Sequence, residues 1–195
     1  MTLRRLIFPL LLLISLFGCT QRDITRTFDE VETFIMERPD SALAILDTMD
    51  RSRLQTDRTR ASHALLHAMA LDKNFIDVCE DSIAQVAVDY YSKRGPRKYY
   101  ARSLYYLGLA YFYQKDYNKA IIEFTKAEEV AQECDSLYLG MVKSAQAYTY
   151  GKTYNVIEEL ECLRKAFEID SKVSPKYYGD VVKIDLIHSL YNQNY

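Results

Sequence analysis

Residues 99–132 read YYARSLYYLGLAYFYQKDYNKAIIEFTKAEEVAQ, and this stretch decides the fold. Its first part carries apolar or small residues at i, i+3, i+4 and i+7, and its last part at i, i+4 and i+7, which is the spacing of one face of an α-helix. The members of the two stripes are Leu104, Leu107, Gly108 and Tyr111, then Ala120, Phe124 and Ala127. The polar run 114–118 separates them, and Asp116 is a suitable N-cap residue for the second helix. The sequence therefore predicts two helices joined by a short turn.

Small residues lie where these two predicted helices would meet. Gly108 has no side chain, while Ala120 and Ala127 have only a methyl group. Two antiparallel helices can approach closely at such positions, with Phe124 filling the space beside the contact. Helix propensity alone disfavours a glycine in the middle of a helix. Gly108 therefore indicates a packing requirement.

This pattern resembles the tetratricopeptide repeat (TPR), whose signature is W-x2-L-G-x2-Y…A-x3-F…P. Leu104 stands at the Trp position and Gln132 at the Pro position, and the other positions match. The resemblance implies an all-α solenoid of helical hairpins, stacked in a right-handed superhelix, with a concave groove that binds a protein or peptide partner. An unrelated helical hairpin with the same spacing is the alternative.

Composition supports a folded, helical chain and gives no drive toward nucleic acid. The 195 residues are 49% apolar and include only 6 Gly and 4 Pro, which argues against disorder. The net charge is −2, and removal of Arg4 and Arg5 would leave 23 basic against 27 acidic residues, or −4. Nucleic-acid binding proteins usually carry a basic excess, so no nucleic acid partner is expected.

Residues 1–18 have the layout of a bacterial lipoprotein signal peptide. Two arginines precede the apolar run 6–17, which is short for a membrane-spanning helix. The run ends in LFGC at 16–19, which is similar to the lipobox of bacterial lipoproteins. In that family the cysteine becomes the lipidated N-terminus after cleavage. An uncleaved anchor, or an ordinary signal peptide with a coincidental cysteine, is the alternative.

The lipobox resemblance implies that Cys19 carries the lipid and that residues 19–22 form a tether. A multiply acylated cysteine anchors a protein stably in a membrane. The expected location is the cell envelope of a Gram-negative-type bacterium, most simply the periplasmic side of the outer membrane. The solenoid would then occupy residues 23–195, with 99–132 as its central repeat and degenerate repeats on both sides.

Apolar periodicity predicts four helices before the central repeat. The expected inward residues are Ile24, Phe28, Val31 and Ile35; Ala42, Ile45, Leu46 and Met49; Ala61, Ala64, Leu65, Ala68 and Met69; and Ile83, Val86, Ala87 and Tyr90. Pro39 suits the first turn of the second of these helices, and Asp57 the start of the third.

Three more helices are predicted after the central repeat. Met141, Ala145 and Tyr148 reproduce the spacing of Leu104, Gly108 and Tyr111, and the next helix would bury Val156, Leu160, Leu163 and Phe167. A ninth helix is predicted to open at Pro175, with Ile184, Ile187 and Tyr191 facing inward. That helix either caps the stack or marks the chain as a fragment of a longer array, and we favour the fragment.

In TPR proteins the first helix of each pair lines the groove, and this resemblance nominates a set of partner-binding residues. They are Arg102, Tyr105, Leu109 and Phe112 in the central repeat, and Val142, Gln146 and Thr149 in the next one. Tyrosine offers a large contact area with a polar tip, which suits peptide recognition. The alternative is that these side chains pack against neighbouring repeats.

Other candidate sites are weaker. His63 and His67 have the i, i+4 spacing of metal ligands, but no third ligand is evident, so two structural histidines are favoured. The basic cluster Lys93, Arg94, Arg97, Lys98 and Arg102 would contact an acidic peptide or lipid headgroups, or form a solvated turn. Cys79, Cys134 and Cys162 form no metal or redox motif and are expected to be small buried residues, with a Cys134–Cys162 bridge as the alternative.

The function predicted from the sequence is binding without catalysis. No nucleophile–base pair, phosphate-binding glycine loop or paired-carboxylate motif is present, so an enzyme, a cofactor and a bound metal are not expected. The sequence predicts a membrane-anchored TPR scaffold that binds a protein or peptide. The alternatives are the N-terminal sensor or regulatory part of a larger TPR signalling protein, and a glycan-binding accessory lipoprotein.

Overall fold

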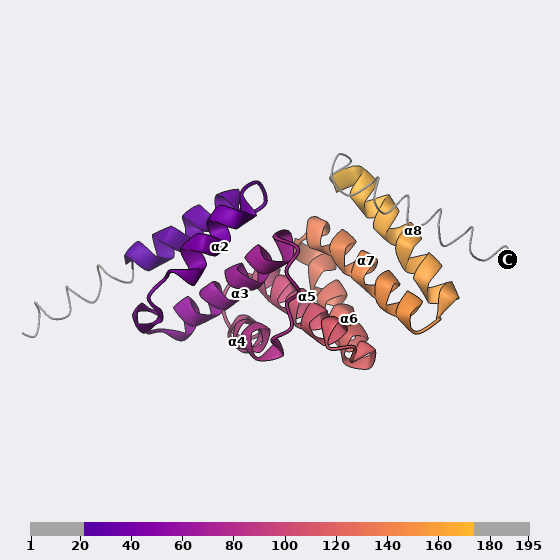
Figure 1. Ribbon diagram of the computed structural model, residues 1–195. Helices are drawn as coiled ribbons and strands as arrows, with labels where there is room; N and C mark the ends of the chain where they lie inside the picture. The colour runs from indigo at the N-terminus through magenta and orange to yellow at the C-terminus, as the bar shows by residue number, and fades with distance from the viewer. Residues whose placement is uncertain (1–21, 174–195) are drawn as a thin grey trace, which may run out of the picture. The chain divides into compact units, whose positions relative to one another are not determined.

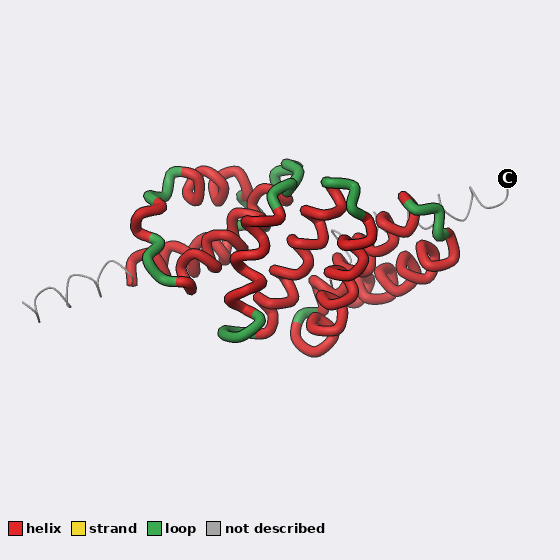
Figure 2. Tube along the Cα trace, turned by 90° about the horizontal axis from the view of Figure 1, so that it is seen from below, coloured by secondary structure: helices red, strands yellow, loops and turns green. Residues whose placement is uncertain are grey.

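The computed structural model describes residues 22–173, and all regular structure in that range is helical (Figure 2). The all-α prediction is confirmed for these residues. The predicted signal peptide 1–18, the anchor Cys19 and the ninth helix from Pro175 lie outside the described residues. The chain forms two compact units, Met1–Ile76 and Asp77–Tyr195, and each is described by itself.

The first unit contains helical residues 22–34, α2 (Pro39–Asp47), the 3-10 turn η1 (Arg51–Arg53) and α3 (Asp57–Lys73). Pro39 occupies the first turn of α2, as predicted. A capping box between Thr56 and Thr59 starts α3. These signals are local: Pro39 has no backbone N–H to leave unpaired, and the capping box satisfies N–H groups within the first turn of α3.

The core of the first unit follows the predicted stripes except around α2, where Ile45 is exposed and Met49, beyond the end of the helix, is only partly buried. Every inward residue predicted for the first and third helices is buried: Ile24, Phe28, Val31 and Ile35, then Ala61, Ala64, Leu65, Ala68 and Met69. In the short helix α2, Ala42 and Leu46 are buried as predicted, but Ile45 is exposed. The buried stripe of α2 is thus a single i, i+4 row, narrower than the sequence indicated.

The second unit contains α4 (Asp81–Tyr91), α5 (Arg97–Tyr113), α6 (Tyr117–Cys134), α7 (Ser136–Lys152) and α8 (Val156–Val173). Each helix packs against the next one in the chain, and α5 also contacts α7 (Figure 1). Asp116 caps α6 by accepting a hydrogen bond from the backbone N–H of Lys119, as predicted. Consecutive packing of paired helices is compatible with an α-solenoid.

Helix α5 packs tightly against Phe124 of α6 at Gly108, as the sequence predicted. A Cβ atom placed on Gly108 would lie 2.5 Å from the Cδ1 and Cε1 atoms of Phe124. Phe124, Ala120 and Ala127 are completely buried on the facing side of α6. The aromatic ring therefore occupies the space that any other residue at position 108 would need.

The α7–α8 hairpin repeats the α5–α6 hairpin at an interval of 39 residues, from Arg97 to Ser136 and from Tyr117 to Val156. In both hairpins a 17-residue helix is followed by an 18-residue helix. The turns match as well, because Lys115 (φ 63°) and Tyr154 (φ 60°) are both left-handed. The two hairpins are therefore copies of one backbone plan.

This interval corrects the predicted register of the second hairpin. Ala147, and not Ala145, is equivalent to Gly108, and it packs in a cluster with Cys162, Leu163 and Ala166. Tyr148 was predicted to face inward but is 50% exposed. The sequence match at Ala145 was two residues out of phase, because an alanine is present at both positions and the spacing alone does not distinguish them.

Two helices are rotated relative to their predicted faces. Helix α4 buries Ala84, Ala87 and Tyr91, whereas Val86 is exposed. The Tyr91 ring packs against the Tyr99 ring of α5, at 5.3 Å between centroids, so it lies on the face of α4 that contacts α5. Helix α8 buries Cys162, Leu163, Ala166 and Asp170, so of the residues predicted to face inward only Leu163 is fully inside.

Candidate functional site

Most of the predicted groove residues are interior residues of the second unit. Tyr105, Leu109, Val142, Gln146 and Thr149 are all buried. The Tyr105 ring, for example, lies 5.6 Å from the Tyr138 ring of α7 and 6.0 Å from the Phe124 ring of α6, measured between centroids. These five side chains lie in the packed interior and present little surface in the described structure, so their role in a groove stays a prediction.

Arg102 is also engaged within the fold. Its Nε donates a hydrogen bond to Asp135 Oδ2 at 2.8 Å, and the guanidinium lies 4.8 Å from the centre of the Tyr138 ring. Asp135 Oδ1 in turn accepts a hydrogen bond from the backbone N–H of Tyr138, which caps α7. Arg102 thus ties α5 to the start of α7, and its charge is balanced inside the molecule.

A cluster of hydrogen-bonded polar side chains joins α6 and α7. Lys143 Nζ lies 2.5 Å from Glu128 Oε1 and donates to Gln146 Oε1 at 3.1 Å, while Gln146 Nε2 donates to Glu128 Oε2 at 2.9 Å. Burial opposes ionisation of Glu128, but the bonds from Lys143 and Gln146 outweigh it and lower the pKa of that carboxyl. The predicted groove residue Gln146 therefore has a structural role here.

Three aromatic residues at the end of the α5–α6 hairpin remain accessible. Phe112 and Tyr113 lie on the last turn of α5, and Tyr117 begins α6. The Phe112 ring lies 5.6 Å from the Tyr113 ring and 5.7 Å from the Tyr117 ring, and all three residues are partly exposed. Phe112 belongs to the predicted groove set and is the member that keeps an accessible aromatic ring.

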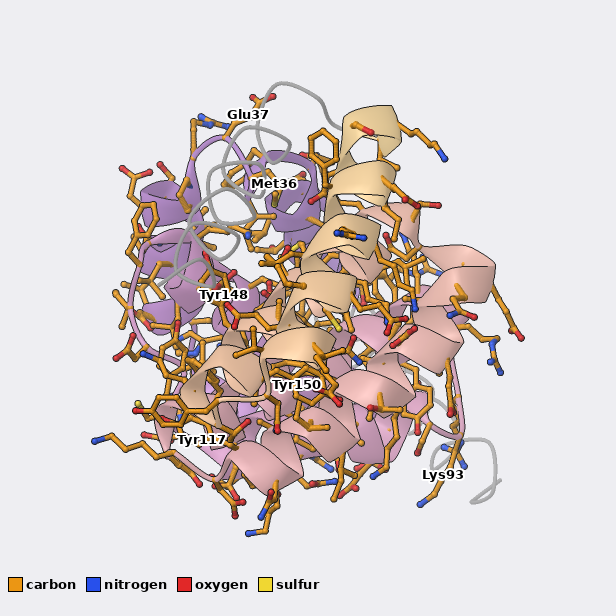
Figure 3. The ribbon with its side chains drawn as sticks, turned by 90° about the vertical axis from the view of Figure 1, so that its right-hand side faces the viewer. Met36, Glu37, Lys93, Tyr117, Tyr148 and Tyr150 are labelled. Atoms are coloured by element: carbon orange, nitrogen blue, oxygen red, sulfur yellow. The ribbon has the colours of Figure 1, made fainter. Side chains whose placement is uncertain are left out.

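The α7–α8 hairpin adds a further exposed aromatic residue. Tyr148 is the equivalent of Leu109 at the 39-residue interval, and it is half exposed where Leu109 is buried. In Figure 3, Tyr148 and Tyr117 lie toward the left of the view and Lys93 lies toward its right-hand edge. We call Phe112, Tyr113, Tyr117 and Tyr148 the aromatic residues of the candidate surface.

The turn between α7 and α8 is unusually apolar for an exposed turn. Tyr154 is 90% exposed and Ile157 is 79% exposed. The equivalent positions in the preceding hairpin are Lys115 and Asn118, both polar. The two turns have the same backbone conformation but carry different side chains. Neighbouring large apolar side chains that are exposed to solvent are typical of contact surfaces.

Gly140 and Asp170 form an unusual contact between α7 and α8. A Cβ atom on Gly140 would overlap Asp170 Oδ1, so the carboxyl group occupies the space that the glycine leaves. Oδ1 has no hydrogen-bond partner among the residues that the structure describes. Burial raises the pKa of Asp170 to about 6. The equivalent positions in the first hairpin are Ala101 and Ala131, which are apolar and completely buried.

The histidine pair of α3 makes no metal site. Within residues 22–173 no group of three potential ligands lies close enough together to hold a metal ion. His63 Nε2 instead contacts the Leu46 carbonyl oxygen at 3.0 Å, and His67 Nε2 contacts Asp47 Oδ1 at 2.8 Å. Both histidines therefore join α3 to the end of α2.

The basic cluster is partly neutralised by neighbouring carboxylates. Arg97 pairs with Glu133 at 3.1 Å, and Arg102 pairs with Asp135. Lys93 and Arg94 are exposed in the turn before α5. This arrangement favours the interpretation of the cluster as a solvated turn over its interpretation as a continuous basic surface.

The described cysteines are free thiols. Cys162 is buried, as predicted, and burial raises the pKa of its thiol. Cys79 and Cys134 are exposed, so the prediction of a buried position is wrong for these two. The Cys134–Cys162 bridge is not formed.

The fold and the accessible surface thus define an all-α protein built from packed helical hairpins. No protein-family model matches the chain. No curated protein matches it significantly either. In the part of the chain that the structure describes, every helix is too short or too polar to cross a membrane.

Proposed function

We propose that this protein is a membrane-anchored, non-catalytic scaffold of the TPR type, which binds a protein or peptide through the second unit. The observation that carries the scaffold proposal is the recurrence of a helical hairpin at 39 residues. This interval is longer than the 34 residues of a TPR, so the TPR type rests on the sequence signature at residues 104–127 alone. Repeated hairpins of this kind can be stacked into a continuous core, and they leave an extended surface for a partner. The lipidation of Cys19 belongs to the same proposal and supplies the anchor.

The aromatic residues of the candidate surface are the best contact residues for that partner. Phe112, Tyr113 and Tyr117 form one cluster, and Tyr148 stands on the next hairpin. Aromatic side chains bury a large area and lose little conformational entropy on binding, so they dominate the energetics of many interfaces. Tyr105 is unsuitable as a probe of binding, because its removal would disturb the contacts among α5, α6 and α7.

The test is a selection of peptides from a displayed random library on the purified full chain, followed by measurement of the dissociation constant of the selected peptide. The double variant Phe112→Ala/Tyr148→Ala is expected to weaken binding at least tenfold, because each truncation removes an exposed aromatic contact. Ile122→Ala is the matched control. Ile122 is 52% exposed but lies on α6, outside the candidate surface, and its loss should leave the constant unchanged.

Two results would contradict the proposal. One is a selected peptide whose affinity is the same for the double variant and for the unmodified chain. The other is the absence of any selected peptide together with saccharide binding that depends on Phe112 and Tyr148, which would favour the glycan-binding alternative. Circular dichroism of each variant establishes that the helices are retained before affinities are compared.

A further inference from the structure

The two histidines of α3 are arranged as a stacked pair facing one end of α2. The centroids of the His63 and His67 rings are 5.6 Å apart and the rings are nearly parallel, at 11°. His63 is buried, and the His67 side chain is only 12% exposed. Two imidazoles so close together cannot both take up a proton without mutual repulsion.

The contact made by His63 requires a hydrogen on its Nε2 atom. The Leu46 carbonyl oxygen can only accept a hydrogen bond, so His63 Nε2 must donate, as it does both in one neutral tautomer and in the protonated ring. Asp47 is the last residue of α2, and Leu46 is the residue before it. The histidines therefore bind the C-terminal end of α2 directly to α3.

The surroundings of His63 disfavour a positive charge on its ring. Arg51 in η1 and His67 on α3 oppose protonation of His63, while Asp47 on α2 favours it. From residues 22–34, the Phe28 ring meets the His63 ring edge-on, at 6.3 Å between centroids. Burial is the largest influence and lowers the pKa of His63, although the bond to Leu46 acts in the opposite direction. The packed hairpin therefore favours the neutral ring.

We propose that this stacked histidine pair is an acid-sensitive clasp, which holds α2 on α3 at neutral pH and releases it when His63 takes up a proton. An opened hairpin exposes the His63 ring, whose ordinary pKa is about 6.5. The stability supplied by the neutral ring is fully present above that value. It is lost as pH falls from about 6.5 toward the lower pKa of the packed ring.

The test measures amide hydrogen exchange by NMR for the backbone of α2 in the full chain at pH 7.5 and pH 5.5, expressed as protection factors so that the intrinsic pH dependence cancels. Uptake of one proton lets protection fall by up to about tenfold for each pH unit within the window. His63→Gln keeps an N–H donor for Leu46 but does not titrate, so its protection factors should be the same at both pH values. His188→Gln, which removes the third histidine of the chain, should remain as acid-sensitive as the unmodified protein.

Protection of α2 that is equal at the two pH values in the unmodified chain would overturn the clasp. So would a His63→Gln variant that loses protection in acid to the same extent. If His63→Gln does not fold, the ring resonances of His63 in the unmodified chain decide the matter. An ordinary pKa, or a titration without accompanying loss of α2 protection, would refute the proposal.

Discussion

Gly108 shows how one missing side chain permits the close approach of α5 and α6. Phe124 fills the space beside it and is completely buried, so the ring has little room to move. We predict that Gly108→Ala lowers the free energy of unfolding by about 1–3 kcal/mol, the usual cost of overpacking a core. Urea denaturation followed by circular dichroism measures the change.

Gly151→Ala is the matched control for that substitution. Its Cβ would meet only the carboxyl group of the Glu159 side chain, at 3.2 Å, and this group can rotate away. The control should be neutral or slightly stabilising, because alanine favours a helix more than glycine does. Equal stability of Gly108→Ala and the unmodified chain would contradict the packing of Phe124 against Gly108.

The buried ion pair between Glu128 of α6 and Lys143 of α7 joins the two hairpins. At the 39-residue interval Lys143 is the equivalent of Leu104, and both side chains are buried. The second hairpin therefore has a charged side chain at a position where the first has an apolar one. We predict that Glu128→Ala destabilises the protein by about 3–5 kcal/mol, because it leaves the Lys143 ammonium buried without its partner. The double variant Glu128→Leu/Lys143→Met should be more stable than Glu128→Ala.

A double-mutant cycle in urea measures this coupling, with Glu128→Leu and Lys143→Met as its single variants. Additive losses from the two single variants would show that the pair contributes no specific interaction.

The same ion pair also predicts that the stability of the protein depends on pH. The pKa of Glu128 is lowered in the folded protein. The stability that the ionised Glu128 contributes is therefore fully present at a pH above the ordinary pKa of glutamate, and it is lost as the pH falls through the lowered pKa.

The helix ends repeat one backbone device with different side chains. Phe75, Lys115 and Tyr154 each follow a 17-residue helix in the left-handed conformation. In each case the next residue donates its N–H to a carbonyl five residues earlier, as Ile76 does to Leu71, Asp116 to Tyr111 and Asn155 to Tyr150. This Schellman arrangement usually contains glycine. The exposed aromatic side chains at two of the three positions are therefore not explained by backbone preference.

For the whole molecule, the proposed anchor makes a prediction about location. Cys19→Ser removes the thiol that would be lipidated, and we expect the protein to move from the membrane fraction to the soluble fraction. Fractionation of cells followed by immunoblotting measures the distribution. Cys79→Ser is the control, because it changes an exposed cysteine in the described part of the chain and should not alter location. Persistent membrane association of Cys19→Ser would indicate an uncleaved apolar anchor.

Local features of the chain were predictable. The i, i+4 stripes identified the inner faces of residues 22–34, α3 and α6, because the residues that form each stripe lie on one helix. Helix starts at Pro39 and after Asp116 were also predictable, since each depends on hydrogen bonds or backbone angles within one turn. The close contact at Gly108 followed from the glycine itself, which no helix would otherwise favour.

The accessible surface was less predictable than the helices. Tyr148 was missed as an exposed residue because Ala145 and Ala147 both satisfy the requirement for a small side chain. The spacing of two tyrosine pairs, from Tyr99 to Tyr138 and from Tyr111 to Tyr150, does contain the 39-residue interval and was the available signal. Periodicity did not indicate that five members of the predicted groove set are buried, because it does not report how many neighbouring helices cover a given face.

The amino-acid order was sufficient to specify which segments are helices and where the tightest pair meets, since short-range hydrogen bonds and steric size control both. The rotation of α4, the phase of α7 and the burial of Tyr105 and Gln146 depended on packing between different helices. The rotation of each helix about its axis is determined by how its bulky side chains pack and how its charged groups pair with the neighbouring helices. That arrangement is a property of all the contacting surfaces together, so it became visible only in the folded molecule.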